Sequence, residues 1–163
     1  IRVVSDQGQN LRLHPDTGQM VDGDAGAAGL QPDPPLAYAP GDRAAGSTPQ
    51  VAAAAYTYNL RNEKLTTNYA IDLGHGTLVT QGSHEDTKPP VSPNTGRLFT
   101  VGPLGVPGLK DAHFDIADQD NAAFAALRTD ATRLYRLDLA TGKASLVGTL
   151  ADGGALRGLA LEP

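Results

Sequence analysis

Apolar and polar residues alternate along short segments of this chain, and turn-forming residues separate the segments. The clearest example runs from Leu134 to Gly148, where every second residue is apolar as far as Leu139. Ala140-Thr141-Gly142 interrupts the alternation, and an apolar pattern resumes at Ala144. A period of two on both sides of a glycine-ended turn predicts a strand, a tight turn and a returning strand.

The same pattern predicts strands along most of the chain. They are expected at Ile1 to Ser5, Leu11 to Leu13, Met20 to Val21, Val51 to Asn59, Leu65 to Leu73, Thr77 to Thr80, Arg97 to Val106, Phe114 to Ala117, Ala122 to Leu127, Leu134 to Leu139, Ala144 to Leu150 and Leu156 to Leu161. In contrast, residues 22–50 show no periodic pattern of apolar residues and are expected to form a long loop, which Tyr38 could anchor by apolar packing. Loops of this length usually serve binding, pack on a neighbouring element, or have no ordered structure.

The turns repeat a common pattern. Four glycines each close a four-residue turn: Gly18, Gly76, Gly96 and Gly142. The residue before the glycine is Thr17, His75, Thr95 and Thr141, and the residue four before it includes His14, Asp72 and Asp138. Glycine adopts a positive φ, and short polar side chains bond the turn backbone, so these positions predict a repeated hairpin.

The repeat predicts the fold class: all-β, with antiparallel four-stranded blade-like repeats in a partial or complete β-propeller-like arrangement. The last repeat divides into strands near 112–117, 122–128, 134–139 and 144–150, which is close to a blade of about 40 to 45 residues. Two earlier units are looser. Residues 1–163 are read as one domain, which could be a fragment of a longer one. Leu156 to Leu161 could complete the first unit, and a partner or a second copy would cover the remaining open edges.

Composition narrows the function. There are 19 glycines and 12 prolines, aromatic residues make up 5%, and the net charge is −5 without a Lys/Arg cluster. Nucleic acid is therefore not an expected partner. The chain has no cysteine, which excludes thiolate chemistry and disulfides. No apolar run is long enough for a transmembrane segment.

Several segments together resemble a known family. They are IRVVSDQGQNLRLHPDTGQ, AAAAYTYN, LVTQGS, LFTVGPLGV, HFDIADQDNAAFAAL and LYRLDLATGKASLVGTL. This set resembles a secreted bacterial family known only as a domain of unknown function, the one numbered 4394, over nearly the whole chain. The resemblance implies that further repeats precede the equivalent of Ile1, and it implies an extracellular or cell-envelope location. It brings no catalytic residues.

The four histidines are the candidate metal ligands: His14, His75, His84 and His113. Without cysteine, copper or zinc would have to be bound by imidazole and carboxylate. A copper-only site of this kind could dismutate superoxide. Exposed turn histidines are the ordinary alternative, and the H-x-H pair typical of copper–zinc dismutases is absent.

A second metal hypothesis concerns the densest group of oxygen ligands, Asp115, Asp118 and Asp120 with Asn121. They could contribute to a calcium site, although the glycine and the distal glutamate of an EF-hand loop are missing. An Asx-rich hairpin turn explains the same residues. No G-x-S-x-G motif or phosphate-binding glycine loop occurs.

Two functions from different classes remain. The first is a bacterial envelope or extracellular module that binds other envelope proteins or itself and so assembles a surface complex. The second is a copper-dependent superoxide dismutase with a histidine-ligated site. A sugar-binding module is a weaker third option, for which Tyr38, Tyr56 and Tyr58 are the candidate aromatic contacts.

Overall fold

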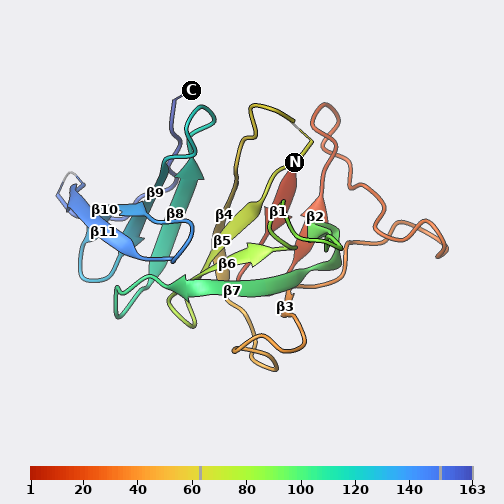
Figure 1. Ribbon diagram of the computed structural model, residues 1–163, viewed down its shortest axis with the longest axis horizontal. Helices are drawn as coiled ribbons and strands as arrows, with labels where there is room; N and C mark the ends of the chain where they lie inside the picture. The colour runs from red at the N-terminus through yellow and green to blue at the C-terminus, as the bar shows by residue number, and fades with distance from the viewer. Residues whose placement is uncertain (63, 151, 163) are drawn as a thin grey trace.

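The chain is built from β-strands arranged in three sheets (Figure 1). The computed structural model describes residues 1–62, 64–150 and 152–162. Its strands are β1 (Arg2–Val4), β2 (Asn10–Arg12), β3 (Ala37–Tyr38), β4 (Val51–Tyr56), β5 (Asn68–Asp72), β6 (Thr77–Gln81), β7 (Arg97–Pro103), β8 (Asp111–Ile116), β9 (Ala123–Arg128), β10 (Thr132–Leu137) and β11 (Ala144–Thr149). Apart from the 3-10 turn η1 (Pro93–Thr95), no helix occurs in these ranges. The predicted all-β class is confirmed.

The two larger sheets are meanders in chain order, as the repeat predicts. β8, β9, β10 and β11 form a four-stranded antiparallel sheet. β4, β5, β6 and β7 form a second antiparallel meander, and β3 extends it by pairing parallel to β7. β1 and β2 form a separate two-stranded hairpin. Each meander has the strand order of a propeller blade.

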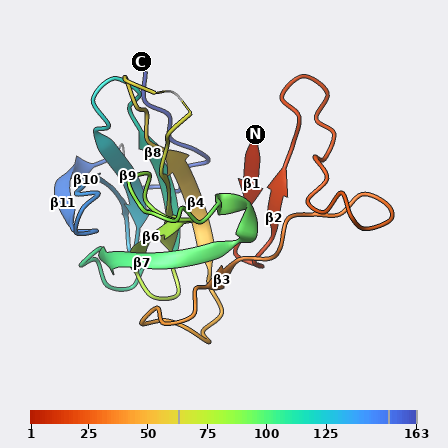
Figure 2. The same ribbon diagram turned by 45° about the vertical axis from the view of Figure 1, so that its right-hand side comes forward.

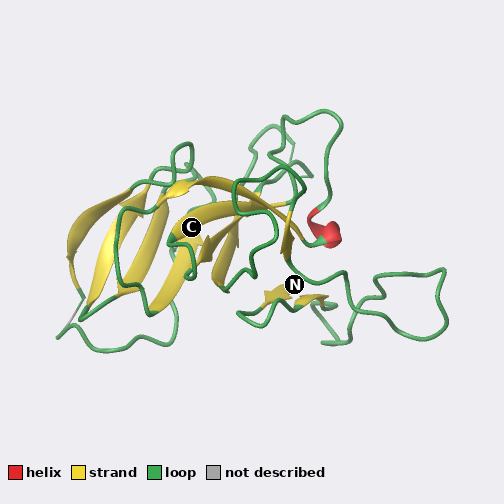
Figure 3. Cartoon of the chain, turned by 90° about the horizontal axis from the view of Figure 1, so that it is seen from below, coloured by secondary structure: helices red, strands yellow, loops and turns green. Residues whose placement is uncertain are grey.

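The sheets lie in a row, with the five-stranded sheet in the middle (Figures 1 and 2). Its strand β4 contacts β1 on one side and β8 on the other. The same row is visible from below in Figure 3. Because the middle sheet has a neighbour on both faces, every residue of β5 and of β6 is buried. Strands buried on both faces read as continuous apolar or small runs rather than as a clean alternation.

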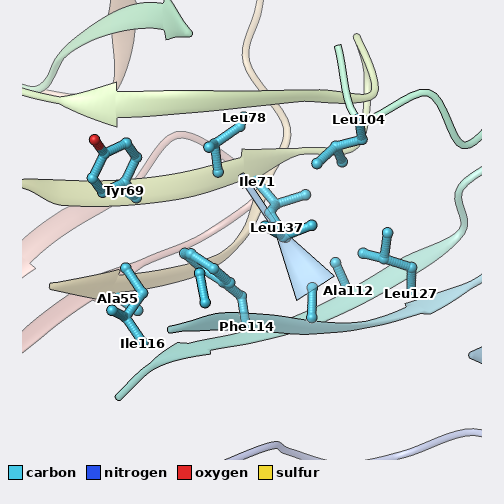
Figure 4. Packing of buried hydrophobic residues seen from close by; sticks show 12 residues of the cluster. Ala55, Tyr69, Ile71, Leu78, Leu104, Ala112, Phe114, Ile116, Leu127 and Leu137 are labelled. Atoms are coloured by element: carbon cyan, nitrogen blue, oxygen red, sulfur yellow. The ribbon is translucent and has the colours of Figure 1, made fainter. Parts of the chain in front are cut away.

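The main core fills the space between the two larger sheets. Tyr69, Ile71 and Leu78 come from the middle sheet, and they meet residues of β8, β9 and β10, among them Phe114 and Leu137 (Figure 4). A second cluster on the opposite face of the middle sheet includes Ala70, Val79 and Leu98, together with Leu36 and Tyr38 from the long loop.

The repeated turns are built as the sequence predicts. Their glycines all have a positive φ, namely 68° at Gly18, 61° at Gly76, 69° at Gly96 and 80° at Gly142. In each turn the first residue accepts a hydrogen bond from the backbone N–H two residues further on; these acceptors are His14, Asp72, Ser92 and Asp138. The threonine before the glycine does the same at Thr17, Thr95 and Thr141. The alignment therefore reflects a shared turn structure.

Three strand predictions need correction. Leu156 to Leu161 is not a strand and does not complete the first unit: it lies along β8, where the Leu161 N–H donates to Asp115. Side chains rather than a neighbouring strand bind its backbone. Met20 makes only an isolated bridge with Leu13. The strand expected from Leu65 begins at Asn68, and Leu65 is exposed.

Close backbone contact joins the two larger sheets. The turn that ends at Gly142 lies against β7 at Gly102, where an added Cβ would overlap the Thr141 carbonyl oxygen. Next to it, the Ala144 N–H donates to the Leu104 carbonyl at 3.0 Å. A side chain at Gly102 would force the two sheets apart.

This contact generates a stability prediction. Gly102→Ala should lower the free energy of unfolding by about 1 to 3 kcal/mol, the usual cost of overpacking, as measured by urea denaturation. Gly148→Ala is the control, because an added Cβ there meets nothing within 4 Å. Equal stability of the two variants would show that the sheets are not in close contact at Gly102.

Candidate functional site

A buried carboxylate organises the most distinctive polar cluster of the molecule. Asp72, the last residue of β5, is 0% exposed. It accepts hydrogen bonds from the backbone N–H groups of Gly74 at 2.8 Å and Gln50 at 3.1 Å. It also bonds the Tyr38 hydroxyl and, at 3.0 Å, Nδ1 of His75. Burial alone would raise the pKa of Asp72, but these four hydrogen bonds together lower it.

Tyr38 brings the long loop into this cluster. It lies in β3, and its hydroxyl donates to Asp72. Its ring meets the His75 ring edge-on, with the ring centroids 5.4 Å apart. Burial and the bond to Asp72 raise the pKa of Tyr38, so the hydroxyl stays protonated and remains a donor.

His75 is the member of the cluster that reaches solvent. It occupies the turn position that threonine holds in the other repeats, and its side chain is partly exposed. Because ionised Asp72 only accepts hydrogen bonds, we assign the ring proton to Nδ1, which leaves Nε2 as an acceptor. His75 lines a groove of about 490 Å³ between its own turn and residues 103–109. The other residues that line this groove are apolar or glycine.

This cluster can hold an imidazole in a fixed orientation, but it supplies one ligand and no nucleophile. A metal site needs several converging donors. Nucleophilic catalysis needs a free hydroxyl or thiol beside the base, whereas the Tyr38 hydroxyl, 3.5 Å from His75 Nδ1, is already bonded to Asp72. The clear consequence of the cluster is structural: Asp72 joins β3, the start of β4 and the second turn at one buried point.

The other predicted copper ligands do not join His75. His75 precedes β6 and His84 follows it, so the whole strand lies between them. The strand has five residues, each of which spans about 3.3 Å. His14 and His84 are exposed turn residues whose Nδ1 atoms accept from nearby backbone N–H groups. His113 lies on β8, with Nε2 3.1 Å from the Leu156 carbonyl oxygen. In the described part of the chain, no three His, Asp or Glu residues are placed to hold a metal.

The predicted calcium ligands serve as backbone acceptors. Asp115 accepts from its neighbour Ile116 and from Leu161. Asp120 accepts from the Ala122 N–H at 2.8 Å, which is the Asx-turn alternative. Asn121, at φ 56°, exchanges two hydrogen bonds with the Tyr58 backbone. Asp118 makes none of these hydrogen bonds, and within the described ranges these carboxylates form no group that could hold a metal ion.

A buried ion-pair network was not predicted from the sequence. Asp33, in the long loop, accepts two hydrogen bonds of 2.8 Å from the Arg12 guanidinium, and Arg2 approaches it at 3.4 Å. Its side chain is 1% exposed. Arg2 also bonds the Tyr56 hydroxyl at 2.9 Å. No motif spacing links residues 2, 12 and 33, so only the folded chain reveals the network.

The aromatic residues proposed for sugar binding are differently placed. Tyr38 is buried in the Asp72 cluster, so the expectation of an exposed ring is wrong there. Tyr56 and Tyr58 are partly exposed, and the Tyr56 hydroxyl is already bonded to Arg2.

The fold and its turns define an all-β repeat protein with blade-like sheets. The chain belongs to the family described as Domain of unknown function (DUF4394), whose model matches residues 1–160. Searches of curated proteins and of solved structures found no match. Within the ranges that the structure describes, no helix has the length and apolar character needed to cross a membrane.

The Asp72 cluster generates a prediction with a pH dependence. Asp72→Asn should lower the free energy of unfolding at pH 7 by about 2 to 3 kcal/mol, because buried donors lose a charged acceptor. The folded-state pKa of Asp72 lies below its unfolded value, so this stabilisation is complete above about pH 4 to 5 and is lost as the pH falls through the folded value. Urea denaturation at several pH values measures it.

The matched control is Asp138→Asn, which changes the same turn position on the exposed surface. It should cost clearly less than Asp72→Asn at pH 7. A gap between wild type and Asp72→Asn that stays constant down to pH 2 would contradict the assigned role of the carboxylate.

The scattered histidines generate a prediction about copper. Because His75 and His84 lie at opposite ends of β6, copper added at neutral pH should bind substoichiometrically, and equally in wild type and in the His75→Ala/His84→Ala variant. Metal analysis after desalting, with copper EPR, measures both. One tightly bound copper per chain that the double variant loses would contradict this prediction and favour a site shared between subunits.

Proposed function

We propose that this protein is a β-repeat module of the bacterial cell envelope or extracellular space that assembles with copies of itself through the β1–β2 hairpin. The observation that supports this most is the orientation of the hairpin: its polar face is buried inside the protein and its apolar face is directed to solvent.

The inward face of the hairpin carries its charged and amide side chains, together with Val4, which packs against the second core cluster. Arg2 and Arg12 are paired across the strands and both reach buried Asp33. Asn10, which is 1% exposed, accepts from the Gln81 side chain at 2.9 Å. These contacts dock the hairpin on the middle sheet and the long loop.

The outward face is apolar. Residues alternate in a strand, so Ile1, Val3 and Leu11 lie on the face opposite Arg2 and Arg12. Ile1 is 70% exposed and Val3 is 38% exposed, and Val3 pairs with Leu11 across the strands. An isolated hairpin is marginally stable, and apolar surface gains stability when it is removed from water.

The outer edge of the hairpin, which belongs to β2, adds backbone groups to this surface. β1 lies between β4 and β2 (Figures 1 and 2), and among the described strands β2 pairs with β1 alone, apart from the isolated bridge of Leu13 to Met20. An unpaired edge next to an apolar face is a template for another sheet.

A second copy fits this surface because the protein already packs such sheets in a row. The hairpin lies on β4, and β4 lies on β8, in one continuing order. A sheet of a neighbouring copy on the outward face would extend the row by the same packing. Contacts of this head-to-tail kind produce rings or filaments.

The test is the association state of the full chain, measured by sedimentation over a range of concentrations. Wild type should form oligomers. Val3→Asp should weaken association by about tenfold or more, because it places a charge in the buried contact. Val147→Asp is the control: Val147 is also exposed, but it lies on β11 at the opposite side of the molecule.

A monomeric wild type at every concentration would contradict self-assembly, as would equal effects of the two variants. An oligomer that only Val147→Asp disrupts would place the interface on β11 instead.

A further inference from the structure

A cavity lies between the two larger sheets, apart from the hairpin and from the His75 groove. Its volume is about 740 Å³, within the range of about 300 to 1,000 Å³ typical of small-molecule sites. Its floor is a row of cross-strand neighbours on the middle sheet, Tyr69, Thr80 and Phe99. Glu85 lines it from the loop after β6, and Leu139 lines it from the second sheet.

Most hydroxyl groups around this cavity are already used. Thr57 accepts from the Thr67 N–H, Thr67 accepts from the Glu85 N–H, and Thr80 donates to the Gly82 carbonyl. Ser83 accepts from the Val91 N–H. These side chains hold the wall together and leave little hydrogen-bonding capacity for a ligand.

Among the described residues, two hydroxyls that line the cavity make no hydrogen bond: that of Thr87, which is exposed, and that of Tyr69. The Tyr69 ring belongs to the main core and the residue is only 4% exposed, while its hydroxyl points away from the other core side chains (Figure 4). No hydrogen bond to this hydroxyl is found in the described part of the chain. The Glu85 Oε2 atom beside it is buried and lacks a partner among the described residues, and a buried polar atom normally has one, so the cavity offers a place for a hydrogen-bond donor.

The cavity is electrostatically negative. One oxygen of the Glu85 carboxylate accepts from Asn59 at 3.2 Å, and the other has no partner. Burial raises the pKa of Tyr69, and the negative charge of Glu85 raises it further. Among the described residues, His84 lines the cavity but no lysine or arginine does. An anionic ligand is therefore disfavoured.

We infer that this cavity binds a small organic ammonium ion with a compact apolar body. The ammonium group would donate to the Tyr69 hydroxyl oxygen within the field of Glu85, and the apolar body would lie against Phe99, Leu139 and Val101. A sugar fits less well, because it needs many free polar partners and most of the hydroxyls here are engaged.

Benzylammonium is the probe, with benzyl alcohol and benzoate as neutral and anionic molecules of the same shape. Calorimetric titration of the full chain should show saturable binding of benzylammonium and binding at least about tenfold weaker for the other two, the factor typical of one charge-assisted hydrogen bond. Equal affinity for all three, or no binding of benzylammonium, would overturn the inference.

Two variants locate the site. Tyr69→Phe removes the hydroxyl and keeps the core ring, and Glu85→Gln removes the charge while keeping the shape; each should weaken benzylammonium binding by about tenfold. Tyr135→Phe is the control, because Tyr135 lies on β10 and does not line the cavity. Unchanged binding in a folded Tyr69→Phe or Glu85→Gln protein would place the ligand elsewhere. If Tyr69→Phe does not fold, Glu85→Gln alone decides.

Discussion

The ion pairs of Asp33 determine which face of the hairpin the protein presents to its surroundings. A buried carboxylate is strongly unfavourable unless it is paired, and both partners of Asp33 lie on one face of the hairpin. Turning the hairpin over would leave that carboxylate unpaired inside the protein. Ile1 and Val3 are therefore held on the outside, although their burial would be favourable. The exposed apolar face is a consequence of the buried ion pairs.

A second buried carboxylate fixes the long loop in the same way. Residues 22–50 have almost no regular structure, yet Asp33 anchors them to the hairpin and Tyr38 anchors them to Asp72. Between these two points the loop supplies Leu36 to the second core cluster. It works by packing on the middle sheet. The hairpin, the loop and the middle sheet thus depend on two carboxylates that are satisfied by groups distant in sequence.

Local features were predictable from the sequence, and distant pairings were not. Gly142 and Asp138 reveal a turn because each acts within five residues, and the strands on either side follow from their period of two. β3 was not predicted, because it has only two residues and pairs in parallel with β7, which lies 60 residues further along the chain. Leu156 to Leu161 has the alternation of a strand, but β8 offers it side-chain partners in place of a free edge.

The residues of the candidate site were likewise predictable only where their contacts are local in sequence. His75 and Asp72 were both visible as variations on the repeated turn, and their contact is local. Asp33 and Tyr69 were missed as functional residues, and Tyr38 was expected as a sugar contact rather than as a partner of Asp72, because their roles come from contacts between different sheets and loops. The copper hypothesis required His84 and His75 to lie close enough to bind one metal. The strand between them keeps these residues apart.

The most direct test of self-assembly uses the absence of native cysteine. A spin label on Val3→Cys reports the environment of the outward hairpin face, and a label on Asp24→Cys reports an exposed loop as a control. Self-assembly predicts that the label at position 3 becomes immobilised as the protein concentration rises, while the label at position 24 stays mobile. Labels that remain equally mobile at every concentration would contradict it.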